Sequence, residues 1–152
     1  ILSYLHQSMS FYKPANSHAD ANKRVDQLLQ EIGLTDKRDL PAGTLSHGDQ
    51  RLLEIGLAMA PEPKLLFLDE PTAGMNPVER VRVLENIRRL SIEKESTFVI
   101  VEHDMDIVFS LSDRIVVLHR GQILADGTPA EIKGNEDVRK VYLGEEIFWE
   151  KK

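Results

Sequence analysis

Cysteine is absent from the 152 residues, so neither a disulfide nor a thiolate metal site can form, which fits a reducing compartment. Long apolar runs are absent too. Stretches such as Ile115 to Leu118 are far shorter than the roughly 20 residues of a membrane-spanning helix. The sequence also does not begin with Met. We expect no membrane-spanning segment within it, and we expect it to be a piece of a longer protein.

A glycine-rich phosphate loop of the form GxxxxGK[ST] is also missing, because no Gly-Lys pair occurs anywhere in the sequence. Where such a loop is present, its lysine reaches the β- and γ-phosphates of a nucleotide and its Ser or Thr ligates Mg²⁺. These 152 residues by themselves therefore cannot cradle phosphates in that way.

Basic residues do not predominate. There are 19 Lys and Arg against 25 Asp and Glu, which gives a formal net charge of -6. This balance argues against free DNA or RNA as the main partner. With 41% hydrophobic and 29% charged residues, the composition is that of an ordinary globular domain with one core.

Apolar residues recur at helical spacing in three longer segments, which favours helices there. Gly33 ends the first as a C-cap, and Pro77 begins the third as its first residue. Two short apolar runs, LLFLD and TFVIV, predict buried strands, and a tight turn at Arg120-Gly121 joins two further strands. The predicted helices cover residues 19–32, 49–59, 77–93, 105–111, 129–133 and 136–142.

Strands separated by helices predict an α/β fold with a mostly parallel sheet that is covered on both faces. Ligands of such sheets bind beyond the carboxyl ends of the strands. Asp69 and Glu70 end the first strand, and Glu102 and His103 follow the next. We therefore expect these four polar groups to meet at one edge of the sheet.

The adjacent acids Asp69 and Glu70 require a cation, a proton or water, because neighbouring carboxylates repel each other and are costly to desolvate. Mg²⁺ is commonly held by one or two carboxylates together with substrate phosphates. An Asp at the tip of a strand can ligate this metal, while the next Glu orients an attacking water as a base. The alternative is a solvated strand end that begins a turn at Pro71.

The segment LSHGDQ, residues 45–50, directly precedes a predicted buried helix. Ser46 is a natural N-cap, Gly48 lets the backbone approach a ligand, and the helix start offers free N–H groups suited to a phosphate. His103 can hydrogen-bond a transferring phosphate or orient water. The alternatives are a plain N-cap and an ordinary surface histidine. The five histidines show no metal-ligand spacing, so we expect no zinc site.

Taken in order, LSHGDQ, LLFLDEP, AGMNP and VEH resemble the signature, Walker B, D-loop and H-loop motifs of ABC-transporter ATPase subunits. The resemblance covers nearly the whole chain, which is similar to the C-terminal part of such a subunit. The wording LEIGLAMA, DEPTAGMNP, ADGTPAEI and VYLGEE is most similar to the branched-chain amino-acid importer subfamily. Urea importers and a lipopolysaccharide-exporting relative share much of this wording, which leaves the cargo open.

This resemblance implies a partial P-loop NTPase core with a mostly parallel sheet, whose N-terminal Walker A part is missing. It implies a helical subdomain at residues 1–60 and the C-terminal part of a RecA-like core at residues 61–152. It also implies that Asp69 helps to hold Mg²⁺, that Glu70 is the catalytic base toward the γ-phosphate of ATP, and that His103 contacts this phosphate.

The resemblance assigns two loops to a dimer interface, namely the signature loop, residues 45–50, and the D-loop, residues 73–77. Asn76 is the D-loop residue implied to lie there. The implied partners are a second ATPase subunit and transmembrane permease subunits, at the cytoplasmic face of the cell membrane. The signature residues implied to bind the ATP of the opposite subunit are Ser46, His47, Gly48 and Asp49.

Three residues of these loops depart from the usual family pattern. His47 and Asp49 stand where Gly and Gln are usual, and an aspartate adds negative charge near a phosphate, so we expect its side chain to point away. Asn76 stands where the D-loop commonly has Asp, which removes one charge from interface contacts, although GMNP or GLNP is familiar in the branched-chain amino-acid importer subfamily.

Phosphoryl transfer depends almost wholly on positioning and charge stabilisation, so we expect the chain without a P-loop neither to bind ATP tightly nor to hydrolyse it. We also expect its truncated sheet to leave apolar surface bare. One alternative is a non-catalytic permease-docking or regulatory module. Another is an ABC ATPase of translation or DNA repair, but those usually carry two motif sets or a long insertion, and neither occurs here.

Overall fold

The computed structural model describes residues 19–143, which fall into two compact units divided after Val101. The first unit is Ile1–Val101 and the second is Glu102–Lys152, and each is described by itself. The predicted division between residues 60 and 61 falls inside the first unit and stays a prediction. Among residues 19–143, no helix combines the length and the apolar character needed to cross a membrane.

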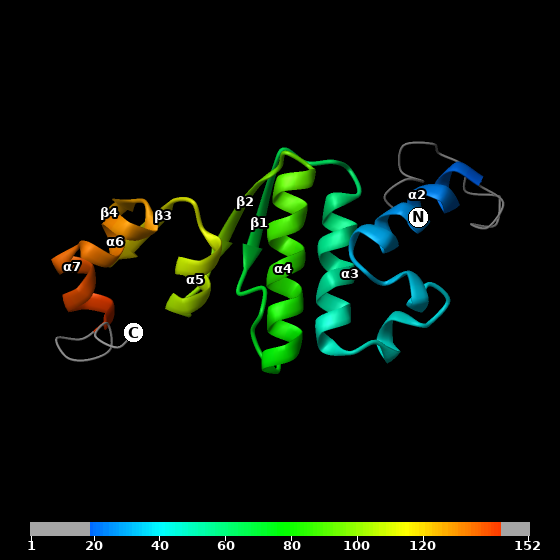
Figure 1. The fold of residues 1–152 in the computed structure, drawn as a ribbon, viewed down its shortest axis with the longest axis horizontal. Helices are drawn as coiled ribbons and strands as arrows, with labels where there is room; N and C mark the ends of the chain where they lie inside the picture. Colours follow the sequence, from blue (N-terminus) through cyan, green and yellow to red (C-terminus); the bar gives the residue numbers. More distant parts are fainter. Residues whose placement is uncertain (1–18, 144–152) are drawn as a thin grey trace. The chain divides into compact units, whose positions relative to one another are not determined.

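Residues 19–101 of the first unit form three α-helices and one pair of strands, and Figure 1 shows α4 between the strand pair and α3. The predicted elements are confirmed, with α3 beginning two residues earlier than expected. Two short 3-10 turns, η2 and η3, were not predicted, because their segment reads as a plain loop. The elements are α2 (Ala19–Glu31), η2 (Thr35–Lys37), η3 (Ala42–Thr44), α3 (His47–Met59), β1 (Leu65–Asp69), α4 (Pro77–Glu93) and β2 (Thr97–Val101).

Buried apolar side chains of α3 and α4, together with residues at the end of α2, form the core of this unit. Leu52 and Ile55 of α3 and Ile87 of α4 are almost fully buried. The contact between α2 and α3 is close, because a Cβ atom on Gly56 would lie 2.9 Å from Cδ1 of Ile32. Glycine at this position therefore sets the spacing of the two helices.

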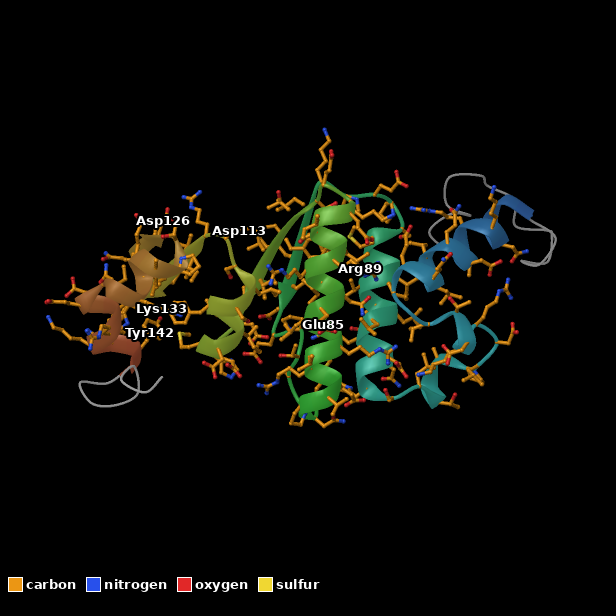
Figure 2. All side chains as sticks on the ribbon, viewed as in Figure 1. Glu85, Arg89, Asp113, Asp126, Lys133 and Tyr142 are labelled. Carbon is orange, nitrogen blue, oxygen red and sulfur yellow. The ribbon has the colours of Figure 1, made fainter. Side chains whose placement is uncertain are left out.

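The C-terminus of α2 is closed by a glycine and by arginines from α4. Gly33 has a φ of 71° and ends the helix, with Leu34 donating its N–H to the Leu29 carbonyl at 2.8 Å, the pattern of a Schellman motif. Arg82 donates to the Gly33 carbonyl at 3.1 Å. Arg89, which Figure 2 labels on α4, donates to the Glu31 carbonyl. Cations at this helix end also suit its negative dipole end.

β1 and β2 pair in parallel, with Leu65 opposite Thr97 and Asp69 opposite Val101. Along each strand the side chains alternate between an exposed and a half-buried face. Phe67, with 67% of its surface exposed, lies on the exposed face. Within residues 19–101, the expectation that both faces are covered is therefore wrong, because one face of the strand pair is exposed. The expected bare apolar surface is confirmed.

The second unit is built on an antiparallel hairpin of β3 and β4. Arg120 and Gly121 both have positive φ angles, of 48° and 77°, as a two-residue type I′ turn requires. The expected turn is therefore confirmed. The elements are α5 (Met105–Leu111), β3 (Ile115–His119), β4 (Gln122–Gly127), α6 (Pro129–Gly134), α7 (Glu136–Val138) and the π-helical turn η4 (Arg139–Leu143).

Polar and cation–π contacts hold together the hairpin and the helical turns of the second unit. Arg114 donates two hydrogen bonds to the Asp126 carboxylate, at 2.7 and 2.6 Å, and the Tyr142 hydroxyl donates to the Leu118 carbonyl. The Lys133 ammonium lies 4.6 Å from the centre of the Phe109 ring. Figure 2 labels Asp126, Lys133 and Tyr142. A small apolar core lies beneath these contacts and comprises Ile115, Ile132 and Val138.

Two residues of α4 test whether the core of the first unit lies where the structure places it. Leu90 is 0% exposed and Ile92 is 71% exposed. We expect Leu90→Ala to lower the free energy of unfolding by about 2–5 kcal/mol, because it leaves a cavity. The matched change Ile92→Ala should stay within about 0.5 kcal/mol of the parent chain. Urea unfolding followed by circular dichroism measures both, and equal losses would contradict the assignment.

Candidate functional site

The acid pair lies at a sharp turn that ends β1. Asp69 is the last residue of the strand, and Glu70 follows in the left-handed region with a φ of 40°. The Glu70 N–H donates to the Val101 carbonyl at 2.9 Å, which extends the parallel pairing by one bond. Both acids are exposed. A non-glycine residue in this conformation is uncommon and costs free energy, so surrounding contacts must hold the turn.

Arg51 of α3 supplies these contacts. Its Nε donates to the Pro71 carbonyl at 3.1 Å, and its Nη2 donates to the carbonyls of Glu70 at 3.1 Å and of Asp69 at 3.3 Å. One guanidinium thus satisfies three successive carbonyls that begin at the last residue of β1, which a planar, always charged fork of donors is suited to do. Arg51 therefore links the turn that carries the acid pair to α3, the helix that begins at the signature loop.

Two backbone N–H groups at the start of α3 are satisfied by acceptors, one from the N-cap and one from α4. Ser46 is the N-cap, and its hydroxyl accepts the Asp49 N–H at 3.3 Å. The Gly48 N–H donates to the Glu79 carboxylate of α4 at 3.3 Å. Hydrogen bonds from the Ser46 hydroxyl and the Gly48 N–H lower the pKa of Glu79 below its usual value, so this carboxylate is charged at neutral pH. Our reading of the sequence missed Glu79, because an acid in the first turn of a helix usually serves its own helix.

The Asp49 side chain is turned into the first unit, where only 3% of the residue is exposed. Its carboxylate pairs with Lys37, after α2, and with Arg82 of α4, whose Nη1 lies at 2.6 Å. Burial alone would raise the pKa of Asp49, but the hydrogen bonds from Lys37 and Arg82 outweigh burial and lower it. The expectation that this side chain points away from the loop surface agrees with these contacts.

The D-loop, residues 73–77, lies against the signature loop of the same chain. The His47 Nε2 donates to the Ala73 carbonyl at 3.3 Å. Asn76 is the N-cap of α4, and its Oδ1 accepts the N–H groups of Val78 and Glu79, both at 3.0 Å. The structure thus brings together the two loops that the family resemblance assigns to a dimer interface.

His103 lies two residues beyond β2 and belongs to the second unit, where it is exposed. Asp104, the next residue, is the N-cap of α5 and accepts the Asp106 N–H at 3.1 Å. Because the units are described separately, the convergence of His103 and Glu102 with Asp69 and Glu70 stays a prediction.

Comparison with known proteins identifies the family. The model of the family described as "ABC transporter" matches residues 2–73, and the model described as "Branched-chain amino acid ATP-binding cassette transporter" matches residues 122–147. The chain belongs to the ABC-transporter ATP-binding family. The resemblance read from the four motifs is thereby confirmed.

Two curated relatives are ATP-binding proteins of branched-chain amino acid transport. The chain is 45% identical over 137 residues to BraF of Pseudomonas aeruginosa, a match that covers 89% of this chain and 54% of BraF. It is 43% identical over 129 residues to LivG of Escherichia coli, covering 85% of this chain and 51% of LivG. The chain thus spans about half the length of the curated relatives it matches.

Solved structures of ABC ATP-binding cassettes share the fold. MJ1267, an ATP-binding cassette of an ABC transporter in its ADP conformation, superposes with a TM-score of 0.76 at 29% identity, covering 91% of this chain and 55% of that one. CbiO1 from Clostridium perfringens, part of the CbiONQ transporter complex, gives a TM-score of 0.73 at 32% identity, covering 91% and 54%. The chain therefore has a partial ABC ATPase fold, as expected.

The residues at the end of β1 fit the Mg²⁺ that this family uses. Within residues 19–143, no group of three or more His, Cys, Asp or Glu side chains forms a metal cluster. A magnesium ion held partly by nucleotide phosphates needs only one or two carboxylates. The exposed Asp69 would supply such a carboxylate, with the exposed Glu70 beside it on the turn that Arg51 holds.

The buried ion pairs of the ABC ATPase chain make its stability depend on pH. We expect Asp49→Asn to lower the free energy of unfolding at pH 7 by about 1–3 kcal/mol, because Lys37 and Arg82 lose their charged partner. Since the pKa of Asp49 is lowered on folding, its stabilisation is complete above the ordinary Asp value of about 3.9 and is lost as pH falls below it.

Urea unfolding of both chains between pH 7 and pH 3 measures this difference. The gap between the parent chain and Asp49→Asn should be constant near neutrality and should narrow in the acid range. Asp36→Asn, at an exposed position beside Lys37, is the matched control and should cost less than about 0.5 kcal/mol. A gap that widens toward acid pH would refute the assigned ion pairs.

Proposed function

We propose that the chain is part of the ATP-hydrolysing subunit of an ABC transporter that powers the import of branched-chain amino acids. The observation that carries this proposal is the acid pair Asp69 and Glu70, held at the end of a parallel strand by the helix that begins at the signature loop. The relatives BraF and LivG are ATP-binding proteins of branched-chain amino acid transport, which supports this cargo. Urea or lipopolysaccharide remains an alternative cargo.

The proposed roles at the strand end follow from charge and position. Bound Mg²⁺–ATP supplies the phosphoryl group and neutralises the charge that develops on it. Asp69 would hold the metal, and Glu70 would accept a proton from the attacking water and orient it. His103 would hydrogen-bond the γ-phosphate.

The proposed dimer uses the two loops that meet in the first unit. The Ser46 hydroxyl and the N–H groups of His47, Gly48 and Asp49 would face the ATP of a second ATPase subunit. Asn76 would contact that subunit through the D-loop. Transmembrane permease subunits complete the proposed assembly, at the cytoplasmic face of the membrane. The Asp49 carboxylate takes no part in nucleotide binding in this proposal, because it is paired inside the unit.

Glu70→Gln in a longer polypeptide, where a P-loop segment precedes residue 1, tests the proposed catalytic role. We expect the substitution to lower the ATPase rate by about 10²–10⁴-fold, because it removes the base without changing the size of the side chain. Release of inorganic phosphate at saturating Mg²⁺–ATP measures the rate. Undiminished turnover would remove Glu70 from its role.

The control is Glu85→Gln, which makes the same chemical change at an exposed position of α4 (Figure 2). It should leave the ATPase rate of the longer polypeptide within about twofold of the parent. The 152-residue chain alone should show neither tight ATP binding nor turnover. Turnover by that chain alone would contradict the need for a P-loop, and an inactive longer polypeptide would favour the non-catalytic docking module.

A further inference from the structure

The carboxylate of Glu79 lies at the start of α3, although Glu79 itself belongs to α4. It accepts the Gly48 N–H at 3.3 Å and a hydrogen bond from the Ser46 hydroxyl. These are donors that the proposed function assigns to the γ-phosphate of the opposite subunit. The loop therefore already holds an anion, and this anion comes from its own chain.

The fit between this carboxylate and the loop is close. A Cβ atom on residue 48 would lie 3.0 Å from the Glu79 Cβ and 3.3 Å from its carboxyl carbon. Glycine at this position thus lets the Glu79 side chain lie directly on the loop backbone. The positive dipole end of α3 favours any negative group placed there, whether carboxylate or phosphate.

Asn76 holds the second oxygen of the same carboxylate. Its Nδ2 donates to the Glu79 Oε2 at 2.8 Å, while its Oδ1 caps α4. The aspartate that is common at this place in the family has no such donor and would repel the Glu79 carboxylate. The departure at Asn76 is therefore suited to holding Glu79 in place.

Contacts between α3 and α4 place Glu79 beside the signature loop. Arg82 lies three residues after Glu79, on the same side of α4, and pairs with the buried Asp49 in the first turn of α3. Two charged residues of α4, Glu79 and Arg82, thus contact the first turn of α3. Asp49 is buried and its partners Lys37 and Arg82 are half-buried, so this contact between α3 and α4 holds while the half-buried Glu79 can exchange its bonds for water.

We propose that Glu79 is a positioning residue that closes the signature loop, its carboxylate occupying the Ser46 and Gly48 donors until an incoming phosphate displaces it. This inference rests on the proposed function, because it takes the phosphate to be that of nucleotide held by a second subunit. A purely structural cap would instead stabilise α3 without opposing an anion.

Glu79→Gln separates these two roles. Glutamine keeps the size of the side chain and an oxygen that accepts the Gly48 N–H, but it removes the charge that competes with phosphate. Tripolyphosphate is the probe, titrated into the ¹⁵N-labelled 152-residue chain while the amide signals of Gly48 and Asp49 are followed by NMR. We expect Glu79→Gln to bind tripolyphosphate at least about fivefold more tightly than the parent chain.

Glu85→Gln is the matched control, since it removes the same charge from an exposed place on the same helix (Figure 2). Residue 85 lies about 9 Å further along the helix axis, beyond the roughly 8 Å screening length at physiological salt. It should leave tripolyphosphate affinity within about twofold of the parent. An equal gain in Glu79→Gln and Glu85→Gln would overturn the proposal, because the effect would then be one of net charge.

Amide hydrogen exchange without added anion tests the contact itself. Glu79→Ala removes the acceptor, and Asn76→Asp keeps the α4 cap but loses the donor to Glu79, so both should speed exchange of the Gly48 N–H. Glu79→Gln should leave that exchange within about threefold of the parent, since its amide oxygen can still accept the bond. Unchanged exchange in Glu79→Ala would overturn the proposal.

The outcomes separate this inference from the proposed function. If no variant responds to tripolyphosphate while the longer polypeptide hydrolyses ATP in a Glu70-dependent way, the role of Glu79 fails and the ATPase function stands. If Glu79→Gln gains affinity as expected while the longer polypeptide is inactive, the loop binds phosphate and the proposed catalysis fails.

Discussion

The contact on which this arrangement most depends is the binding of three successive backbone carbonyls by one guanidinium. Arg51 holds the carbonyls of Asp69, Glu70 and Pro71 at the end of β1, and the turn that carries the two acids has its shape because these bonds are made. Without them, a left-handed Glu70 would lack the support that such a conformation needs. The position of the acids is thus set by α3, the helix that begins at the signature loop, through a residue that directly follows this loop.

The boundaries of most elements follow from local chemistry and were predictable. Pro63 and Pro71 flank the apolar run of β1, and Pro77 at the first position of α4 with Asn76 as its cap defines where that helix begins. The exposure of Phe67 was not predictable, because an apolar run shows what tends to be buried and not which covering element is present.

Some residues of the candidate site were likewise predictable from the sequence, and others were not. Asp69, Glu70 and the signature loop stand out because their residue types follow a strand or precede a helix. Arg51, Glu79 and Arg82 give no such signal, since each reads as part of a solvated helix face and gains its role from a partner 18–33 residues away in sequence. The inward orientation of the Asp49 side chain is explained by its ion pairs with Lys37 and Arg82, which the sequence does not show.

The glycine at the crossing of α2 and α3 limits how this sequence can diverge. A methyl group at Gly56 would meet the Ile32 side chain at 2.9 and 3.2 Å, closer than carbon atoms normally approach. Leu57, the next residue, is exposed and is free of this constraint. Positions 32 and 56 should therefore co-vary among homologues, with a larger residue at 56 accompanied by a smaller one at 32.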